Sequence, residues 1–178
     1  MGRPMLAMDA KTAELMGSKK ILVVDDEHYT RKVIRALLLS IGVKKIQEAC
    51  DGHAGLDAIC TAVPDIVLVD WEMPGLDGPG FVRTVRSPHS FPYPDVPLVM
   101  VTGHGERSRV IEAARLGINE YLLKPISSQA LQARLLSIIN HPRPMVQRGS
   151  YYGPEPRRLS AYKPEDDDHG RTQLVMVG

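Results

Sequence analysis

The feature that most constrains the fold is an alternation, between residues 19 and 140, of short apolar runs with longer segments of helical periodicity. Three runs, at residues 21–24, 66–69 and 98–101, are apolar throughout, as strands buried on both faces should be. Two more mixed runs, at residues 45–49 and 119–122, suit the edges of the same sheet. The pattern predicts a five-stranded parallel sheet with helices on both faces.

Between these runs, apolar residues recur at the spacing of one helix face. Five such stripes predict five helices that pack on the sheet. The stripes consist of Ile34, Leu37, Leu38 and Ile41; Leu56, Ile59, Cys60 and Val63; Phe81, Val82 and Val85; Val110, Ile111 and Ala114; and Leu131, Leu135, Ile138 and Ile139.

The two ends of the chain lack this alternation. Residues 1–18 suit either a short helix at Asp9–Met16 or disorder, and we expect a flexible N-terminal extension. Residues 141–178 are rich in proline, contain the pair Arg157–Arg158 and the acidic run Glu165–Asp168, and suggest an extended tail. The expected organisation is therefore an extension at 1–18, one domain at 19–140 and a tail at 141–178.

Composition excludes several classes of protein. Lysine and arginine number 22 against 21 acidic residues, so no overall charge attracts nucleic acid or anionic lipid. We also expect no DNA-binding output domain after Asn140. No apolar run approaches the roughly 20 residues that cross a bilayer. Cys50 and Cys60 lack metal-site spacing and are expected to be small buried apolar residues in a reducing compartment. We expect a cytoplasmic protein that contacts neither membrane nor nucleic acid.

Polar residues follow four of the predicted strands. Asp25 and Asp26 end the first strand, Asp70 ends the third, Thr102 ends the fourth and Lys124 follows the fifth. Each could be an ordinary helix cap or turn residue. Because ligands of open parallel sheets bind beyond the carboxyl ends of the strands, the joint occurrence predicts one site at that edge.

The residue types indicate the chemistry of this site. Carboxylates that crowd together repel one another, so a cation should lie among them. Ligands that are all oxygen favour a hard ion such as Mg²⁺. A magnesium site beside hydroxyl and ammonium donors can stabilise the charge of a phosphoryl group in transfer, so phosphoryl transfer is the chemistry indicated.

With two glycine turns after the central aspartate, these residues form a specific combination. The set is Asp25–Asp26, Asp70, Pro74–Gly75, Asp77–Gly78, Thr102 and Lys124–Pro125. It resembles the receiver domain of two-component response regulators, of the stand-alone chemotaxis type with a C-terminal tail, over about residues 19–140. The resemblance implies a flavodoxin-like, doubly wound α/β fold with strand order 2-1-3-4-5 and five helices.

The resemblance also implies roles for single residues. Asp70 would accept a phosphoryl group from a histidine kinase or a histidine phosphotransfer protein. Asp25, Asp26, Asp70 and the backbone carbonyl of Glu72 would hold Mg²⁺, while Thr102 and Lys124 would contact phosphoryl oxygens. The peptide bond before Pro125 would be cis.

A switch is implied as well. Tyr121 would turn inward when Thr102 moves to the phosphoryl group, and the surface from Glu106 to Asn140 would change for an unknown downstream protein. The alternative is that Tyr121 simply packs the edge strand. Glu72 and His104 lie two residues after Asp70 and Thr102 and would tune the lifetime of the phosphoryl group, although surface polarity explains both equally well.

Other functions remain as alternatives. A magnesium-dependent phosphohydrolase of the haloacid-dehalogenase type also uses an aspartyl nucleophile, and Asp70-Trp71-Glu72 faintly resembles its motif. In those enzymes, however, the nucleophile precedes the acidic pair, whereas here it follows Asp25–Asp26. A relay intermediate or a phosphate sink without its own output is a further alternative. We expect no multiple-turnover substrate.

Overall fold

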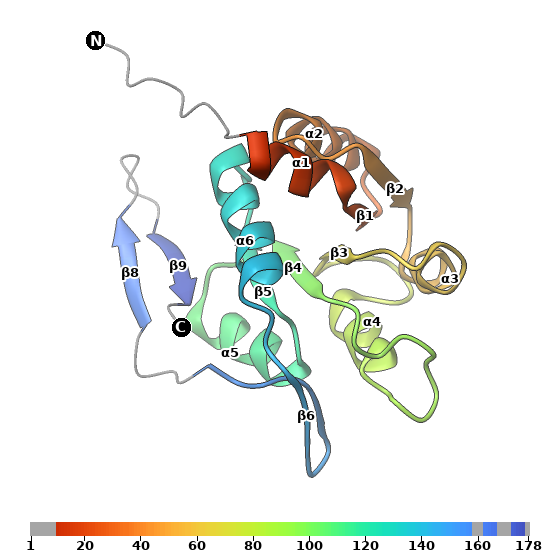
Figure 1. The fold of residues 1–178 in the computed structure, drawn as a ribbon. Coiled ribbons are helices and arrows are strands. Elements are labelled where there is room, and N and C mark those ends of the chain that lie inside the picture. The colour runs from red at the N-terminus through yellow and green to blue at the C-terminus, as the bar shows by residue number, and fades with distance from the viewer. Residues whose placement is uncertain (1–9, 158–161, 167–171, 177–178) are drawn as a thin grey trace.

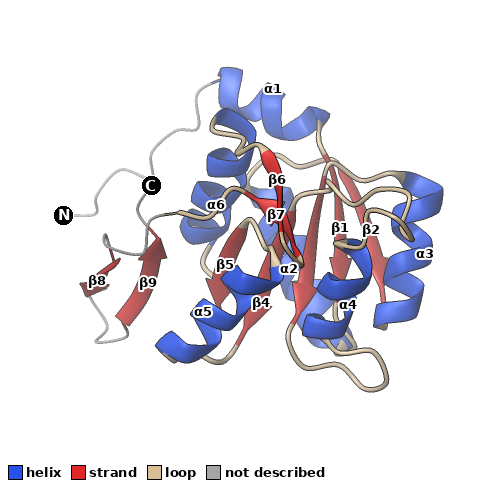
Figure 2. Cartoon of the chain, turned by 90° about the horizontal axis from the view of Figure 1, so that it is seen from below, coloured by secondary structure: helices blue, strands red, loops and turns tan. Residues whose placement is uncertain are grey.

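The centre of the molecule is a sheet of five parallel strands in the order β2-β1-β3-β4-β5 (Figures 1 and 2). The computed structural model describes residues 10–157, 162–166 and 172–176. This is the doubly wound, flavodoxin-like order that the resemblance to receiver domains implies. The strands are β1 (Lys20–Val24), β2 (Lys45–Ala49), β3 (Ile66–Asp70), β4 (Leu98–Thr102) and β5 (Glu120–Leu123).

Helices cover both faces of the sheet because side chains alternate along each strand. Leu22 and Val24 point into a core shared with α3, α4 and α5, whereas Ile21 and Val23 point into a core shared with α1, α2 and α6.

In the described ranges, no helix combines the length and the apolar character that a bilayer crossing requires. The helices are α1 (Ala10–Ser18), α2 (His28–Ser40), α3 (Gly52–Ala62), α4 (Gly78–Val85), α5 (Arg107–Leu116) and α6 (Ser128–Asn140).

The count of five helices is wrong by one, because α1 precedes the first strand. Met16 of this helix is completely buried, in the core that α2 and α6 share. Asp9, at the start of the helix considered from the sequence, lies outside the described residues. A single large apolar side chain thus anchors a segment in which the sequence shows no long apolar stripe.

The end of α3 also differs from prediction. Ile59 faces the sheet as expected, but Cys60 and Val63 are exposed, Val63 by 48%. The helix ends at Ala62, and Val63 turns into the left-handed region with φ of 46° just before Pro64. Proline disfavours a helical residue before it, which explains why the apolar stripe does not continue. Cys50 is exposed too, so the expectation of buried cysteines is wrong.

The segment after α6 folds back on the domain instead of extending away from it. Strands β6 (Met145–Arg148) and β7 (Tyr151–Pro154) form an antiparallel hairpin that contacts α5 (Figure 1). A second antiparallel pair, β8 (Tyr162–Asp166) and β9 (Thr172–Met176), follows. Arg158, Asp167 and Asp168 lie outside the described residues. The division of the chain at residue 140 stays a prediction.

Candidate functional site

Three carboxylates meet at the carboxyl end of the sheet, where parallel pairing of β1 with β3 aligns Val24 with Val69. The residues that follow, Asp25 and Asp70, are therefore neighbours, and Asp26 joins them from the same loop. One carboxylate oxygen from each lies within 4.8 Å of the others. Asp25 and Asp70 are buried and Asp26 is exposed. The cluster thus combines two sheltered carboxylates with one open to solvent.

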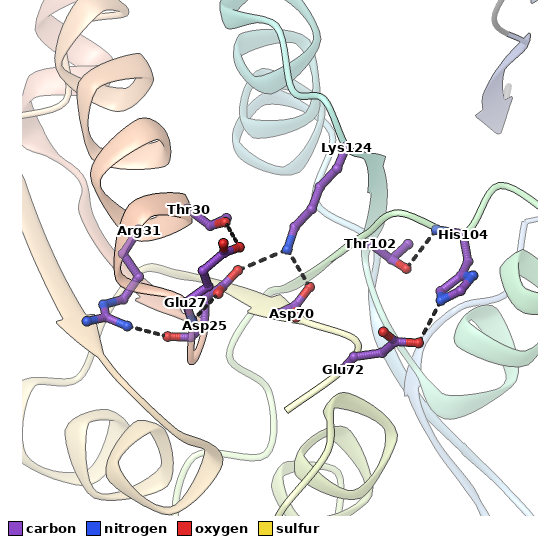
Figure 3. A network of polar contacts seen from close by, with 9 residues as sticks. All are labelled: Asp25, Glu27, Thr30, Arg31, Asp70, Glu72, Thr102, His104 and Lys124. Carbon is purple, nitrogen blue, oxygen red and sulfur yellow. Dashed lines mark hydrogen bonds and ion pairs between the residues drawn. The ribbon is translucent and has the colours of Figure 1, made fainter. Parts of the chain in front are cut away.

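Lys124 supplies the opposite charge from the end of β5 (Figure 3). Its Nζ donates hydrogen bonds to Asp70 Oδ1 at 2.8 Å and to Asp25 Oδ2 at 3.1 Å. The peptide bond between Lys124 and Pro125 is cis, as the resemblance implies. The structure therefore brings together Asp25, Asp26, Asp70 and Lys124, four of the residues that the sequence singles out.

The electrostatics of this cluster are coupled. Burial raises the pKa of the Asp70 carboxyl and the charge of Asp25 raises it further, while Lys124 opposes both. For Lys124, burial alone would lower the pKa, but the hydrogen bonds and charges of Asp70 and Asp25 outweigh it and raise the pKa. The lysine is therefore held in its charged form between two carboxylates.

Thr102 ends β4, next to this cluster, but its hydroxyl bonds to the loop that follows. Thr102 Oγ1 accepts a hydrogen bond of 3.0 Å from the backbone N–H of His104. Tyr121 is buried, and its hydroxyl donates a 2.6 Å hydrogen bond to the carbonyl of His104. Burial raises the pKa of Tyr121 to about 12. The loop at His104 thus connects the hydroxyl near the cluster with the aromatic ring on β5.

Glu72 and His104, which the sequence offered as modulating residues, contact each other. His104 Nε2 lies 2.7 Å from Glu72 Oε1, so the pair links the loop after β3 to the loop after β4 (Figure 3). Glu72 also lines an open pocket of about 570 Å³ together with Asp26 and Trp71. The bonded pair therefore lies beside the entrance to the acidic cluster.

The loop after Asp70 is closely packed against the strand. Asp77 caps α4 by accepting a 2.8 Å hydrogen bond from the N–H of Gly80. A Cβ on Gly78 would lie 2.4 Å from the carbonyl oxygen of Asp70, so only glycine fits there. Trp71 is buried, and Arg109 of α5 lies over its ring, 5.0 Å from the centroid. The only tryptophan therefore adjoins the cluster and can report on it.

Sequence reasoning missed one residue of this network. Arg31 of α2 donates a 2.7 Å hydrogen bond to the backbone carbonyl of Asp25 (Figure 3). Its Nε also pairs with Glu48 Oε2 at 3.5 Å, at the end of β2. Arginine in an amphipathic helix is usually a solvated residue, so no signal in the sequence distinguishes Arg31 from Arg35. In the structure it anchors the loop that carries Asp25 and Asp26.

Comparison with known proteins agrees with this geometry. The family described as the response regulator receiver domain matches residues 21–136. The chemotaxis protein CheY of Pseudomonas aeruginosa is 36% identical over 119 residues, which are 67% of this chain and 94% of that protein. The solved chemotaxis protein CheY4 of Vibrio cholerae is 28% identical, with a TM-score of 0.61, and the match covers 67% of this chain and 98% of that one.

A second solved structure, a response regulator receiver domain protein from Clostridium thermocellum, is 32% identical with a TM-score of 0.59. That match covers 68% of this chain and 94% of the other. The matched region spans the sheet except Lys20, the first residue of β1, and every residue of the acidic cluster. The chain therefore belongs to the receiver domains of response regulators.

Proposed function

We propose that this chain is a phosphorylation-dependent signalling switch whose phosphoryl acceptor is Asp70. The observation that carries the proposal is the ammonium of Lys124, held between the carboxylates of Asp70 and Asp25 with Asp26 alongside. A nucleophilic carboxylate needs its charge balanced while a phosphate dianion approaches, and this cluster supplies a fixed cation. The donor would be a phosphohistidine on a histidine kinase or a histidine phosphotransfer protein.

The donor atoms of the cluster suit a magnesium ion. Asp25, Asp26 and Asp70 offer three carboxylate oxygens that lie close enough to share one ion, and no sulfur or imidazole ligand is among them. The backbone carbonyl of Glu72 is proposed as a further ligand. When bound, Mg²⁺ would neutralise charge on the phosphoryl oxygens.

The transfer itself forms one bond and breaks another. A carboxylate oxygen of Asp70 attacks phosphorus, the phosphorus–nitrogen bond of phosphohistidine breaks, and the electron pair stays on the imidazole nitrogen, which takes a proton. Lys124 keeps Asp70 oriented and then donates to a phosphoryl oxygen. Thr102, which ends the neighbouring strand, would donate its hydroxyl to another phosphoryl oxygen.

The output would pass through the loop at His104. If Thr102 turns its hydroxyl to the phosphoryl group, it gives up the hydrogen bond from the N–H of His104, whose carbonyl accepts from Tyr121. The conformations of this loop and of Tyr121 then depend on phosphorylation. A downstream protein that binds the surface from Glu106 to Asn140 in only one of these conformations would be regulated by population shift.

The test is covalent modification of the intact chain. Incubation with acetyl phosphate and Mg²⁺ should add a single phosphoryl group, about 80 Da, detectable by mass spectrometry. Chelation of Mg²⁺ should prevent the addition. A chain that takes up no phosphoryl group under these conditions would refute the proposal. Hydrolysis of many equivalents of a small phosphoester would instead support a phosphohydrolase of the haloacid-dehalogenase type.

Arg31 provides a test of how the metal site is held in place. Replacing Arg31 with Ala removes the hydrogen bond to the carbonyl of Asp25 and should weaken Mg²⁺ binding by about tenfold, since residues that orient ligands have effects of that size. The change in Trp71 fluorescence on titration with Mg²⁺ measures the affinity. The control is Arg35→Ala, which removes the same charge from the same helix but contacts Glu48 and Ile46, not the loop. Equal weakening in both variants would contradict a positioning role.

The bonded pair of Glu72 and His104 is predicted to limit access of water to the phosphoryl group. We expect Glu72→Ala and His104→Ala each to accelerate dephosphorylation several-fold, because each breaks the 2.7 Å contact between the two loops. The double variant should be no faster than either single variant, since both remove the same barrier. Loss of phosphorylated protein, followed by mass after removal of the donor, gives the rate. Unchanged rates in both single variants would disprove the modulating role.

A further inference from the structure

The C-terminal hairpin creates a groove that the domain without it would lack. The groove has a volume of about 260 Å³ and lies between α5 on one side and the C-terminal segment on the other. Its apolar lining comes from both sides. The apolar residues are Ile111, Ala114 and Ile118 from α5 and the turn after it, and Tyr151 and Pro156 from the C-terminal segment.

The wall formed by the hairpin is held by specific contacts. Arg143 donates to the carbonyls of Asn119, at 2.8 Å, and Glu155, at 2.8 Å. Gly153 of β7 lies against Gly117, and a Cβ on Gly153 would be only 2.8 Å from the Cα of Gly117. The hydroxyl of Tyr151 donates to the carbonyl of Pro154 at 2.6 Å. The groove is therefore formed before any partner binds, which lowers the entropic cost of binding.

Positive charge surrounds the apolar floor. Arg115, Arg143 and Arg157 line the groove, and none of the described residues that line it is acidic. The charge of Arg157 is neutralised by its ion pair with the buried Glu120. Arg143 instead donates its hydrogen bonds to backbone carbonyls, which carry no net charge, so its positive charge is not neutralised. The chain as a whole carries a net charge of only +1, so this is a local concentration of charge. An occupant with carboxylates is favoured.

The size of the groove decides between kinds of occupant. Pockets for small organic ligands usually measure about 300–1,000 Å³ and enclose most of the ligand. At about 260 Å³ this groove is smaller, so it suits one or two side chains of a protein segment. The apolar lining would receive those side chains, and the arginines would face acidic residues on either side of them.

We propose that α5 and the C-terminal hairpin together form a docking groove for an acidic segment of a partner protein that inserts one or two large apolar side chains. The inference rests on the proposed signalling function in one respect, because it names the chemistry of the downstream partner. It places the contact at the start of β5, beside Ile118, and makes the hairpin part of the surface that the partner binds.

A synthetic probe tests the groove on the full-length chain. A fluorescent peptide of about twelve residues, with a Leu-Phe pair between aspartates, should bind the unmodified protein with a measurable change in anisotropy. Two control peptides, one with asparagine for each aspartate and one with serine for Leu-Phe, should bind at least tenfold more weakly. Equal binding of all three peptides would refute recognition of an acidic and apolar segment.

Matched variants locate the binding. Arg115→Glu should weaken binding of the probe by about tenfold or more, because it reverses an exposed charge at the groove. Gly153→Val should weaken it too, because the new side chain pushes the hairpin from Gly117. Lys45→Glu makes the same charge change on β2, the opposite edge of the sheet, and should bind normally. Loss of binding in Lys45→Glu equal to that in Arg115→Glu would overturn the assignment.

Two further arms separate this inference from its alternatives. If the probe binds only after Asp166, Asp167 and Asp168 are changed to Asn in the full-length chain, the acidic run of the chain itself occupies the groove and the partner assignment is wrong. Asp70→Asn should bind the probe like the unmodified protein. A chain that takes up a phosphoryl group yet fails to bind the probe refutes the groove alone, and the reverse result refutes the proposed function alone.

Discussion

The Asp70→Asn variant is expected to take up no phosphoryl group and, at the same time, to unfold at a higher temperature than the unmodified chain at pH 7. The first effect follows because asparagine has no carboxylate oxygen to attack phosphorus. The second follows because burial and the neighbouring Asp25 make the charge of Asp70 unfavourable in the folded state. A gain of about 1 kcal/mol would raise Tm by about 2–4 °C in a chain of this length.

The pH dependence of the stability gain has a definite sign. The folded-state pKa of Asp70 is raised above its ordinary value of 3.8, so between the two pKa values the folded state binds more protons than the unfolded state. The contribution of the protonated Asp70 carboxyl to the free energy of unfolding is therefore fully present below about pH 4. It is lost as the pH rises through the folded-state pKa of Asp70. The difference in Tm between Asp70→Asn and the unmodified chain should accordingly grow from acidic to neutral pH.

Calorimetry at several pH values and mass spectrometry after acetyl phosphate treatment check both effects. Asp57→Asn, the same change at an exposed position on α3, is the control and should alter neither phosphoryl uptake nor Tm. Two results would count against the assignment of Asp70. One is a phosphoryl group on the Asp70→Asn chain, and the other is a lower Tm for this variant at pH 7.

Arg157→Ala is expected to cost about 2 kcal/mol of unfolding free energy, although residue 157 lies far beyond the last helix of the domain. Glu120 on β5 has a side chain that is only 2% exposed, and Arg157 donates to its Oε1 at 2.5 Å. Arg134 lies farther away, at 3.9 Å from Oε2. Removal of one partner leaves a buried charge poorly compensated, which typically costs several kcal/mol, and the remaining arginine reduces that cost.

A double-mutant cycle identifies the cause of the loss. Glu120→Gln in the Arg157→Ala background should recover much of the stability, because the buried charge is then absent. Arg148→Ala is the control, since its ion pair with Glu155 at 2.9 Å is exposed on both sides and should contribute less than about 1 kcal/mol. Urea unfolding of Arg157→Ala, Glu120→Gln, the double variant, Arg148→Ala and the unmodified chain measures each value. A loss in Arg157→Ala no larger than in Arg148→Ala would show that the C-terminal segment does not stabilise β5.

Much of the fold was accessible from local pattern. Runs such as residues 66–69 are apolar at every position because helices cover both faces of a parallel sheet. Each central strand must therefore be apolar throughout, so it can be identified from its own residues alone. Once the strands are assigned, their carboxyl ends must lie at one edge. That geometry alone predicts that Asp25, Asp70 and Lys124 meet, and the structure shows that they do.

The predictions that failed depend on contacts between distant segments. Cys60 and Val63 continue the periodicity of α3, but the chain turns at Pro64 and leaves both exposed. Met16 is a single apolar residue in a weakly patterned segment, yet it is completely buried. The sequence gives no sign that Glu120 is buried, but in the structure it pairs with an arginine 37 positions later.

Within residues 19–140, the amino-acid sequence by itself determined which segments are strands and helices, and which polar residues end the strands, because these depend on neighbours a few positions apart. Only the tertiary structure decided that Arg31 anchors the loop of Asp25, that Glu72 bonds to His104, and that the C-terminal hairpin packs on α5. These contacts join segments that are far apart in the sequence. How close such segments come to one another depends on how the helices pack on the sheet, and no local sequence pattern encodes this packing.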